Sequence, residues 1–456
     1  MARHTVILAT DPRLLTPAGR GERERVDYTT RVGGVGLLKR AILSAAKDGA
    51  HEISVLLGSG GGWLHERLAC DPALPADVTW YLTGELPGGE RAVLEALQRR
   101  IDGPFLLVRA NRACTVDTLA RVRAHAGLAP LVSAVSAGLP DEAPREAGLY
   151  LCEPRVLQAA LAEADALSPL EAALVRLANE GRRAKIDLHD RRVIAVASRA
   201  DREAANDMLL LSLIKPHDGV VSKNVNRKVS LALTRRTMDL DWVTPNLFTA
   251  VALIIGLASA ALVATGSYLW IAVGGLLYQL SSIVDGNDGE IARLKFQGSK
   301  FGGWFDTVAD DVTNLSFILG LGLGTARLTG NLGWTVFAVV GVCMGVITVA
   351  HLYAYLAGGE QTNTFDVPWA VLGDDGAERT LLQRFFSIFL VIGKRDFYAL
   401  LFAVLCLLGL VQIPLLLAGT TAIVMGLLKL RESLGTWLAT PPQPIREVTS
   451  TGLRRR

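Results

Sequence analysis

Four aspartates stand within a hydrophobic part of the chain, and they constrain its structure more than any other feature. The stretch reads D-G-N-D-G-E-I-A-R and, after eight further residues, G-G-W-F-D-T-V-A-D; its aspartates are Asp285, Asp288, Asp306 and Asp310. Acids at membrane depth cost free energy, so they are expected to serve a function. If both segments are helical, spacings of three and four residues place each pair on one helix face.

Gly298 and Ser299 lie between the two segments and allow the chain to reverse, so that the two acidic faces can oppose each other. Four facing carboxylates carry about four negative charges, which repel one another unless cations are present. Two divalent hard-acid ions, Mg²⁺ or Mn²⁺, would neutralise them with oxygen ligands. The pattern therefore predicts a di-metal site.

Hydrophobic residues make up 50% of the 456 residues, but they are unevenly spread. Residues 1–243 are mixed and rich in charge, whereas residues 244–436 contain apolar runs long enough to span a bilayer. The net charge of +3 gives no electrostatic support for a nucleic-acid partner. Five scattered cysteines without a C-x2-C pair indicate neither a disulfide framework nor a zinc site, which fits a reducing compartment.

The apolar half predicts an all-α, polytopic membrane domain with six transmembrane helices. They are expected near residues 245–266, 268–294, 301–326, 332–357, 384–409 and 412–435. Lys394, Arg395 and Asp396 interrupt the fifth, which leaves an interfacial helix followed by a shorter span as the alternative. Lysines and arginines gather in the loops on one side of these segments. We therefore expect a multi-pass protein of the cell (inner) membrane, whose termini and metal site face the cytoplasm.

At the acidic stretch the chain resembles the CDP-alcohol phosphotransferase family, whose signature is D-x2-D-G-x2-A-R-x8-G-x3-D-x3-D. All eight fixed positions match: Asp285, Asp288, Gly289, Ala292, Arg293, Gly302, Asp306 and Asp310. The resemblance implies an enzyme in which a hydroxyl attacks the phosphorus that bears the donor's alcohol, and CMP leaves. Two metal ions suit this reaction, because they neutralise charge on the diphosphate.

The resemblance also implies roles for the acids. Carried over by position, Asp285, Asp288 and Asp306 are metal ligands. Asp310 shares a metal and is the expected general base toward the acceptor hydroxyl. Two further acids, Glu290 and Asp311, are turned by about 100° from their neighbours on a helix, which favours supporting or surface roles over metal ligation.

The remaining signature residues are expected to bind the donor. Gly289, Ala292 and Gly302 are small and would let the cytidine approach the helix backbones. Arg293 can pair with a phosphate or with a carboxylate of the site. Four further positions have two readings each. Thr244 and Asn246 either cap the first membrane helix or contact the nucleotide. The Lys394-Arg395 pair either binds an acceptor phosphate or anchors the helix at the cytoplasmic interface.

The N-terminal half alternates apolar strands with helices, which predicts an α/β sheet covered by helices. It resembles the sugar-phosphate nucleotidyltransferase fold, which is fused to such membrane domains in bifunctional inositol-phosphate cytidylyltransferase/phosphotransferase proteins. The matching pieces are V-I-L-A at 6–9, V-G-G-V-G-L-L-K-R-A at 32–41 and F-L-L-V-R-A-N at 105–111.

Departures from this second family predict an inactive domain. The glycine-rich phosphate loop after the first strand is replaced by T-D-P-R-L. Ala110-Asn111 and Ala197 stand where the family has its acidic metal ligands, and without those carboxylates Mg²⁺ cannot be held on a nucleotide. The remaining role would be structural: it would orient the junction helix or support a homodimer.

The predicted organisation has four parts: an α/β domain at 1–200, a junction with a basic interfacial helix at 201–243, the membrane domain at 244–436 and a cytoplasmic tail at 437–456. The first functional hypothesis is phospholipid synthesis from CDP-diacylglycerol and a small alcohol or phosphorylated polyol, such as inositol phosphate or glycerol phosphate. A variant uses soluble CDP-inositol. The alternative from another class is an ion or metabolite transporter, which the absence of obvious inverted repeats disfavours.

Overall fold

The computed structural model describes most of the chain in two compact units. The described residues are 3–18, 25–84, 89–136, 145–163, 168–188, 193–214, 219, 221–358 and 395–439. The first unit comprises Met1–Asp218, Arg227–Pro245 and Asn287–Gly298; the second comprises Gly219–Asn226, Asn246–Gly286 and Ser299–Arg456.

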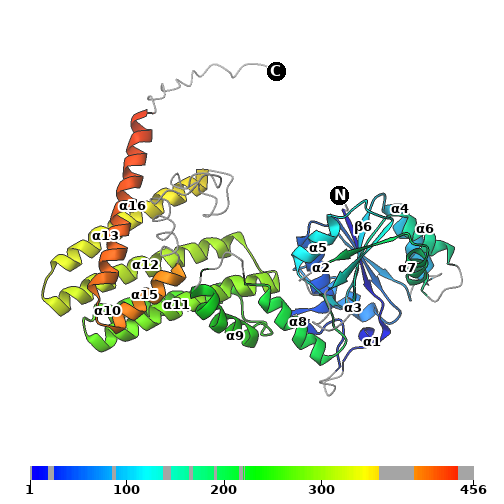
Figure 1. Cartoon of the computed structure of the whole chain (residues 1–456), viewed down its shortest axis with the longest axis horizontal. Helices are drawn as coiled ribbons and strands as arrows, with labels where there is room; N and C mark the ends of the chain where they lie inside the picture. Colours follow the sequence, from blue (N-terminus) through cyan, green and yellow to red (C-terminus); the bar gives the residue numbers. More distant parts are fainter. Residues whose placement is uncertain are drawn as a thin grey trace, which may run out of the picture. The chain divides into compact units, whose positions relative to one another are not determined.

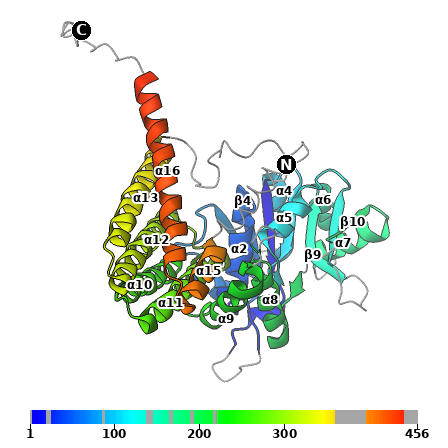
Figure 2. The same cartoon turned by 60° about the vertical axis from the view of Figure 1, so that its left-hand side comes forward.

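A seven-stranded mixed sheet forms the centre of the first unit (Figures 1 and 2). Its strands are β1 (His4–Ala9), β4 (Glu52–Leu57), β5 (Val78–Leu82), β6 (Phe105–Arg109), β8 (Leu131–Ser136), β9 (Arg145–Cys152) and β10 (Arg183–Asp187). The order is β10-β8-β9-β6-β1-β4-β5, and β9 runs antiparallel to both of its neighbours. The predicted α/β architecture is confirmed.

Helices bury both faces of this sheet. They are α1 (Pro12–Leu15), α2 (Leu37–Lys47), α3 (Gly62–Leu68), α4 (Gly89–Arg100), α5 (Val116–Arg123), α6 (Arg155–Ala162) and α7 (Pro169–Asn179). Side chains alternate along β6 as a strand requires. Phe105 and Leu107 join one core with α4, α6 and α7. Leu106 and Val108 join a second core with α5.

Short strands and further helices complete the first unit. A hairpin pairs β2 (Arg31–Val32) with β3 (Val35–Gly36), and β7 (Arg112–Ala113) pairs with β11 (Ile194–Ala195). The unit also contains α8 (Arg199–Leu211) and α9 (Arg227–Thr237). The last residues of the long helix α11 belong to it as well.

The second unit is helical. It contains η1 (Ser222–Asn226), α10 (Pro245–Ala264), most of α11 (Tyr268–Lys295), α12 (Lys300–Thr329), α13 (Gly333–Gly358), α15 (Arg395–Leu407) and α16 (Gln412–Ala439). Tyr278, Phe317 and Phe402 stack in its interior, with ring centroids 3.9 Å apart for the first two. These three rings connect α11, α12 and α15.

Four described helices are long and apolar enough to cross a membrane, whereas six were expected. They are Pro245–Ala264, Tyr268–Lys295, Gly333–Ala354 and Gln412–Arg431. The expected third span, α12, has 30 residues but carries several charged side chains in its first half. The described part of the expected fifth span is α15, which has 13 residues and is about 20 Å long, shorter than a bilayer core of about 30 Å. Residues 384–394 of that expected span lie outside the described residues.

Small residues allow α10 and α12 to pack closely. A Cβ atom on Gly320 would collide with the carbonyl oxygen of Ala260, and one on Gly324 would collide with that of Val263. Close approach through small residues is a common way for membrane helices to pack. The two glycines are one helical turn apart, so they form a continuous contact strip on α12.

Candidate metal centre

Three of the four signature aspartates converge in the second unit. Asp285 comes from α11, and Asp306 and Asp310 come from successive turns of α12. One carboxylate oxygen of each lies within 4.8 Å of the others, and all three residues are half-buried. The chain reverses between the two helices as predicted, and the hydroxyl of Ser299 caps α12 by accepting a hydrogen bond from the Gly302 amide at 2.9 Å.

Asp288 is not part of this group of three. It lies one turn farther along α11, in the segment that belongs to the first compact unit. Its carboxylate accepts a hydrogen bond from the backbone amide of Gly289. Three of the four carboxylates expected to converge, Asp285, Asp306 and Asp310, are thus brought together among the described residues.

Arg395, the first residue of α15, lies against the acidic group. Its Nη1 donates to Asp285 at 2.8 Å and also to Asp310. The side chain is 18% exposed, so the guanidinium partly compensates two carboxylates in a poorly hydrated place. The sequence offered two readings for the Lys394-Arg395 pair, and the structure brings Arg395 to the carboxylates. Lys394 lies outside the described residues.

The donor set fits a hard divalent cation. Mg²⁺ and Mn²⁺ prefer carboxylate oxygens, and Mg²⁺ holds them at about 2.1 Å, so oxygens around one ion are about 3 to 4 Å apart. Oxygens of three side chains within 4.8 Å of one another match that requirement after small adjustments. The cationic guanidinium between Asp285 and Asp310 shows that positive charge is accommodated at this place.

The small signature residues make room for side chains of this chain itself. The Nη1 atom of Arg293 lies 3.3 Å from the place of a Cβ on Gly289. The side-chain oxygens of Ser299 and Asn246 lie 3.0 and 3.1 Å from the place of a Cβ on Gly302. Larger residues at either glycine would displace these polar groups.

Three further residues of the predicted site differ in exposure. Ala292 is half-buried, whereas Arg293 and Thr244 are exposed. The exposed positions of these two side chains leave them able to contact a bound molecule. No hydrogen bond of Thr244 within the described residues decides between the capping and nucleotide-contact readings.

Glu290 is fully buried, so a surface role for it is ruled out. Its carboxylate accepts from the hydroxyls of Ser230 and Thr234, at 2.6 Å each. It also accepts from Nη1 of Arg227 at 2.7 Å. Asn287 adds a bond from its amide to the Ser230 carbonyl at 2.7 Å. The network joins α9 to α11 and so supports the other expectation, that Glu290 has a supporting role.

Other polar pairs near the aspartates were not predicted. The hydroxyl of Tyr278 donates to Asn314 at 2.7 Å, and that of Tyr353 donates to Asp311 at 2.7 Å. Helical spacing would have found the first pair, since Tyr278 precedes Asp285 by two turns and Asn314 follows Asp310 by one. The Tyr353 bond supports the expectation that Asp311 is not a metal ligand.

In the first unit, the positions that the sequence resemblance assigned to the missing acidic ligands lie side by side. The Val196 amide donates to the carbonyl of Asn111 at 2.9 Å, which brings Ala197 close to the end of β6. The nearby acid Asp201 accepts from the amides of Ala197 and Ser198, at 3.1 and 2.9 Å, as part of the capping box of α8. The Asp201 carboxylate thus stabilises the start of α8.

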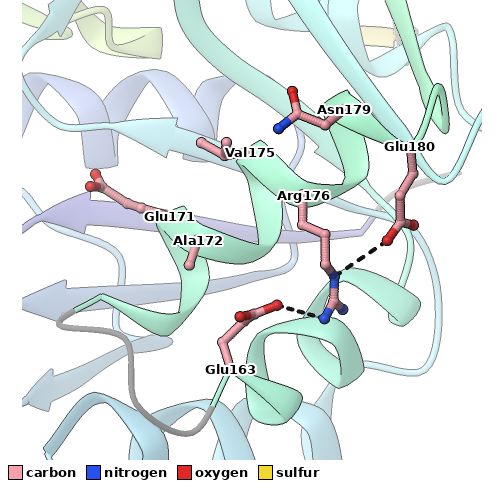
Figure 3. A pocket seen from close by; sticks show the side chains of 7 residues that line it. All are labelled: Glu163, Glu171, Ala172, Val175, Arg176, Asn179 and Glu180. Carbon is pink, nitrogen blue, oxygen red and sulfur yellow. Dashed lines mark ion pairs between the residues drawn. The ribbon is translucent and has the colours of Figure 1, made fainter.

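A surface depression of about 660 Å³ also lies in the first unit, at α6 and α7. Figure 3 shows Arg176 between Glu163 and Glu180, with ion pairs of 2.5 and 3.6 Å. Its lining contains none of the predicted site residues. Because Arg176 neutralises two of its acids, this depression is a poor cation site.

The described residues thus form a helical unit with four candidate membrane spans and three converging carboxylates that suit a metal ion. The sequence matches the model of the family described as CDP-alcohol phosphatidyltransferase over residues 242–425. The bifunctional IPC transferase and DIPP synthase of Rubrobacter xylanophilus is 30% identical over 353 residues, which cover 70% of this chain and 79% of that protein. The chain belongs to the CDP-alcohol phosphatidyltransferase family of enzymes.

The likeness to the Rubrobacter protein extends beyond the membrane helices. Residues 242–456 make up less than half of the chain, so a match over 70% of it includes part of the N-terminal half. This chain therefore combines an N-terminal nucleotidyltransferase-like domain with the phosphatidyltransferase domain, as that relative does.

Other likenesses cover shorter parts. The bifunctional IPC transferase and DIPP synthase of Aquifex aeolicus is 37% identical over 145 residues, which is 32% of each chain. Among solved structures, the inositol-1-phosphate CTP transferase from T. maritima is 16% identical with a TM-score of 0.35; the match covers 45% of this chain and 96% of that one.

Proposed function

We propose that this enzyme transfers inositol phosphate from CDP-inositol to a hydroxyl group of an inositol phosphate, with release of CMP. The observation that carries the proposal is the match to the Rubrobacter protein over 79% of its length, because that relative is named for an inositol-phosphate activity. The acceptor oxygen bonds to the phosphorus that bears the inositol, the phosphoanhydride bond breaks, and the electron pair leaves with CMP.

Asp285, Asp288, Asp306 and Asp310 would hold two divalent ions. The convergence of three of these carboxylates within 4.8 Å supports this assignment. When bound, the ions neutralise the diphosphate and the charge that develops on the leaving oxygen. The chain itself positions the carboxylates through the α11–α12 turn and through the small residues that let α12 approach α10.

Asp310 would accept the proton of the acceptor hydroxyl. It lies at the end of the signature, one turn from Asp306, and shares Arg395 with Asp285. A carboxylate within hydrogen-bond reach of the hydroxyl can act as a general base. Arg395 would bind the phosphate of the acceptor, since a guanidinium presents several donors to an anion.

The N-terminal domain would not make the donor. Ala110-Asn111 and Ala197 lie together without carboxylates, and Asp201 is engaged in a helix cap. A separate cytidylyltransferase would therefore have to supply the CDP-alcohol. This reading keeps the domain as a structural part of the enzyme.

Helix α12 would cross the membrane as a fifth span. It connects α11 and α13, which are both candidate spans, and its 30 residues extend over about 45 Å. Its acids would face the protein interior, as charged side chains in membranes do. The lysines and arginines of the loops would place the active site and the N-terminal domain in the cytoplasm.

The decisive experiment compares donors and acceptors with the purified full chain in detergent. CMP release would be measured with CDP-inositol or CDP-diacylglycerol, each with inositol phosphate, glycerol phosphate or no acceptor, and with Mg²⁺ or Mn²⁺. Release that requires both CDP-inositol and inositol phosphate supports the proposal. Release from CDP-diacylglycerol alone among the donors would replace it with the phospholipid-synthesis reading.

A further inference from the structure

The C-terminal end of α11 is held by residues that precede it by some 250 positions. The last carbonyls of a helix have no partner within the helix and must be satisfied elsewhere. Here the Leu294 carbonyl accepts a hydrogen bond of 2.5 Å from Nη2 of Arg40 in α2. All of these residues belong to the same compact unit.

Arg40 is deeply buried and bound on several sides. Its side chain also donates to the carbonyls of Val32 and Gly33, at 2.7 and 3.0 Å. The residue is 5% exposed, and burial lowers the pKa of its guanidinium to about 10, so it remains charged at neutral pH. A buried cation is favourable at a helix C-terminus, where carbonyl dipoles point outward.

The residues that follow Leu294 complete the attachment. The guanidinium carbon of Arg40 lies 5.3 Å from the ring centroid of Phe296, which adopts a left-handed backbone with φ of 57°. Lys295 donates to the carbonyls of Leu240 and Val243, at 2.7 and 2.9 Å. The end of α11 is thus fixed both to α2 and to the segment that leads into α10.

Space around the β2–β3 hairpin is equally restricted. A Cβ atom on Gly34 would collide with the Met238 carbonyl and lie 3.1 Å from Cε of Lys295. The Gly33 amide donates to the side chain of Asn206 in α8 at 2.7 Å. The V-G-G-V-G-L-L-K-R-A segment, which contains the hairpin and Arg40, therefore packs tightly around the helix end.

We propose that Arg40 is a positioning residue of the phosphotransferase: by capping α11 it fixes the helix segment that carries Asp288 and Arg293. A helix turns by about 100° per residue, so unwinding of its last turn would redirect Arg293 and loosen Asp288 one turn earlier. The N-terminal domain then serves the membrane chemistry through this cap. The effect on activity rests on the proposed function, whereas the cap itself does not.

The first test compares Arg40→Met with Arg123→Met in the full chain in detergent. Arg123 is a matched control: it is a largely buried arginine of the same unit, with a side chain 11% exposed, and it pairs with Asp48 at 2.7 Å. We expect Arg40→Met to increase hydrogen exchange in residues 291–298. We also expect it to lower CMP release by about tenfold to a hundredfold and to raise the half-saturating Mg²⁺ concentration. Arg123→Met should leave the exchange of this segment unchanged.

A second pair of variants acts from the α11 side and leaves the bonds of Arg40 to Val32 and Gly33 in place. Phe296→Leu and Lys295→Met should shift exchange and Mg²⁺ dependence in the same direction, which keeps the proposal testable if Arg40→Met does not fold. Unchanged exchange at 291–298, or activity lost equally in Arg40→Met and Arg123→Met, would overturn it. If the wild type releases no CMP from any donor, the proposed function fails and the exchange comparison alone decides on the cap.

Discussion

The hydroxyl of Thr234 donates to the fully buried carboxylate of Glu290 at 2.6 Å, and this bond shows which side of α9 faces inward. Ser230 and Arg227 bind the same carboxylate, so the inner side of α9 is polar. Val229 on the outer side is 48% exposed. Lys228, Arg235 and Arg236 are exposed as well, and such a mixture of apolar and basic side chains suits a helix at a membrane surface.

The first prediction is that Glu290→Gln strongly destabilises the protein. Arg227 is only 13% exposed on its side chain and would lose its buried counter-charge, which we expect to cost about 3 kcal/mol. Thermal unfolding in detergent would measure the loss. Glu203→Gln is the control, because Glu203 forms an exposed pair with Arg199. Equal shifts for both variants would contradict the role of the network.

The second prediction separates chemistry from binding. Asp310→Asn should lower turnover by at least about a hundredfold, because the general base is lost, while CDP-alcohol binding is largely kept. Asp311→Asn is the matched control, since its carboxylate binds Tyr353. Single-turnover CMP release and calorimetric binding would be measured for both. Near-wild-type release by Asp310→Asn would refute its assignment as the base.

The third prediction concerns the metal ions. Asp285→Ala and Asp288→Ala should each lose Mg²⁺-dependent binding of CDP, because the diphosphate is held through the ions. Mn²⁺ binding, followed by electron paramagnetic resonance, gives a readout that needs no turnover. Retained metal-dependent CDP binding in Asp288→Ala would restrict the site to the three carboxylates that converge in the structure.

The fourth prediction addresses Arg395. Arg395→Gln should raise KM for the phosphorylated acceptor by about tenfold or more, because a charge-assisted bond to the phosphate is removed. Arg395→Lys should recover part of the affinity. A fall in kcat at constant KM would instead indicate that Arg395 only orients Asp285 and Asp310, to which it is bound.

The fifth prediction is that the N-terminal domain consumes no CTP. Pyrophosphate release would be followed with the full-length Asp285→Ala variant, so that any signal is attributable to the N-terminal domain. Sugar and polyol phosphates would be tried in turn with CTP and Mg²⁺. We expect no release above the protein-free blank. CTP-dependent release with any of these acceptors would revive a bifunctional enzyme.

Part of the site followed from sequence because it depends on local rules. The spacing of Asp306 and Asp310, together with the turn at Gly298 and Ser299, was enough to predict that these acids meet Asp285. Arg395 could not be assigned in this way, because it comes from a helix 85 residues beyond Asp310 and no period connects them. Glu290 was placed at an angle away from the metal ligands, but its burial depends on partners in α9.

The fold, too, could be predicted where it depends on local sequence patterns and not where it depends on packing between distant segments. Short apolar runs that alternate with helical segments predicted the sheet, because this order of elements is typical of an α/β fold. Six membrane spans were expected, whereas four of the described helices are long and apolar enough, because hydropathy averages over side chains that the fold separates. In α12 the acids and the apolar residues share one helix. Its mean hydropathy is therefore low, although Phe317 packs in the interior and Asp306 lies in the first turns.

Gly320 and Gly324 fix the position of α12, the helix that carries two carboxylates of the candidate metal centre. Because they hold the backbone of α12 against the carbonyls of Ala260 and Val263, this helix cannot slide or roll along α10 without steric overlap. Asp310 and Gly320 are ten positions apart on this helix, which corresponds to about 15 Å along its axis. The positions of Asp306 and Asp310 are therefore set by a helix contact far from the substrate. A single methyl group added at either glycine would displace α12 and, with it, both carboxylates.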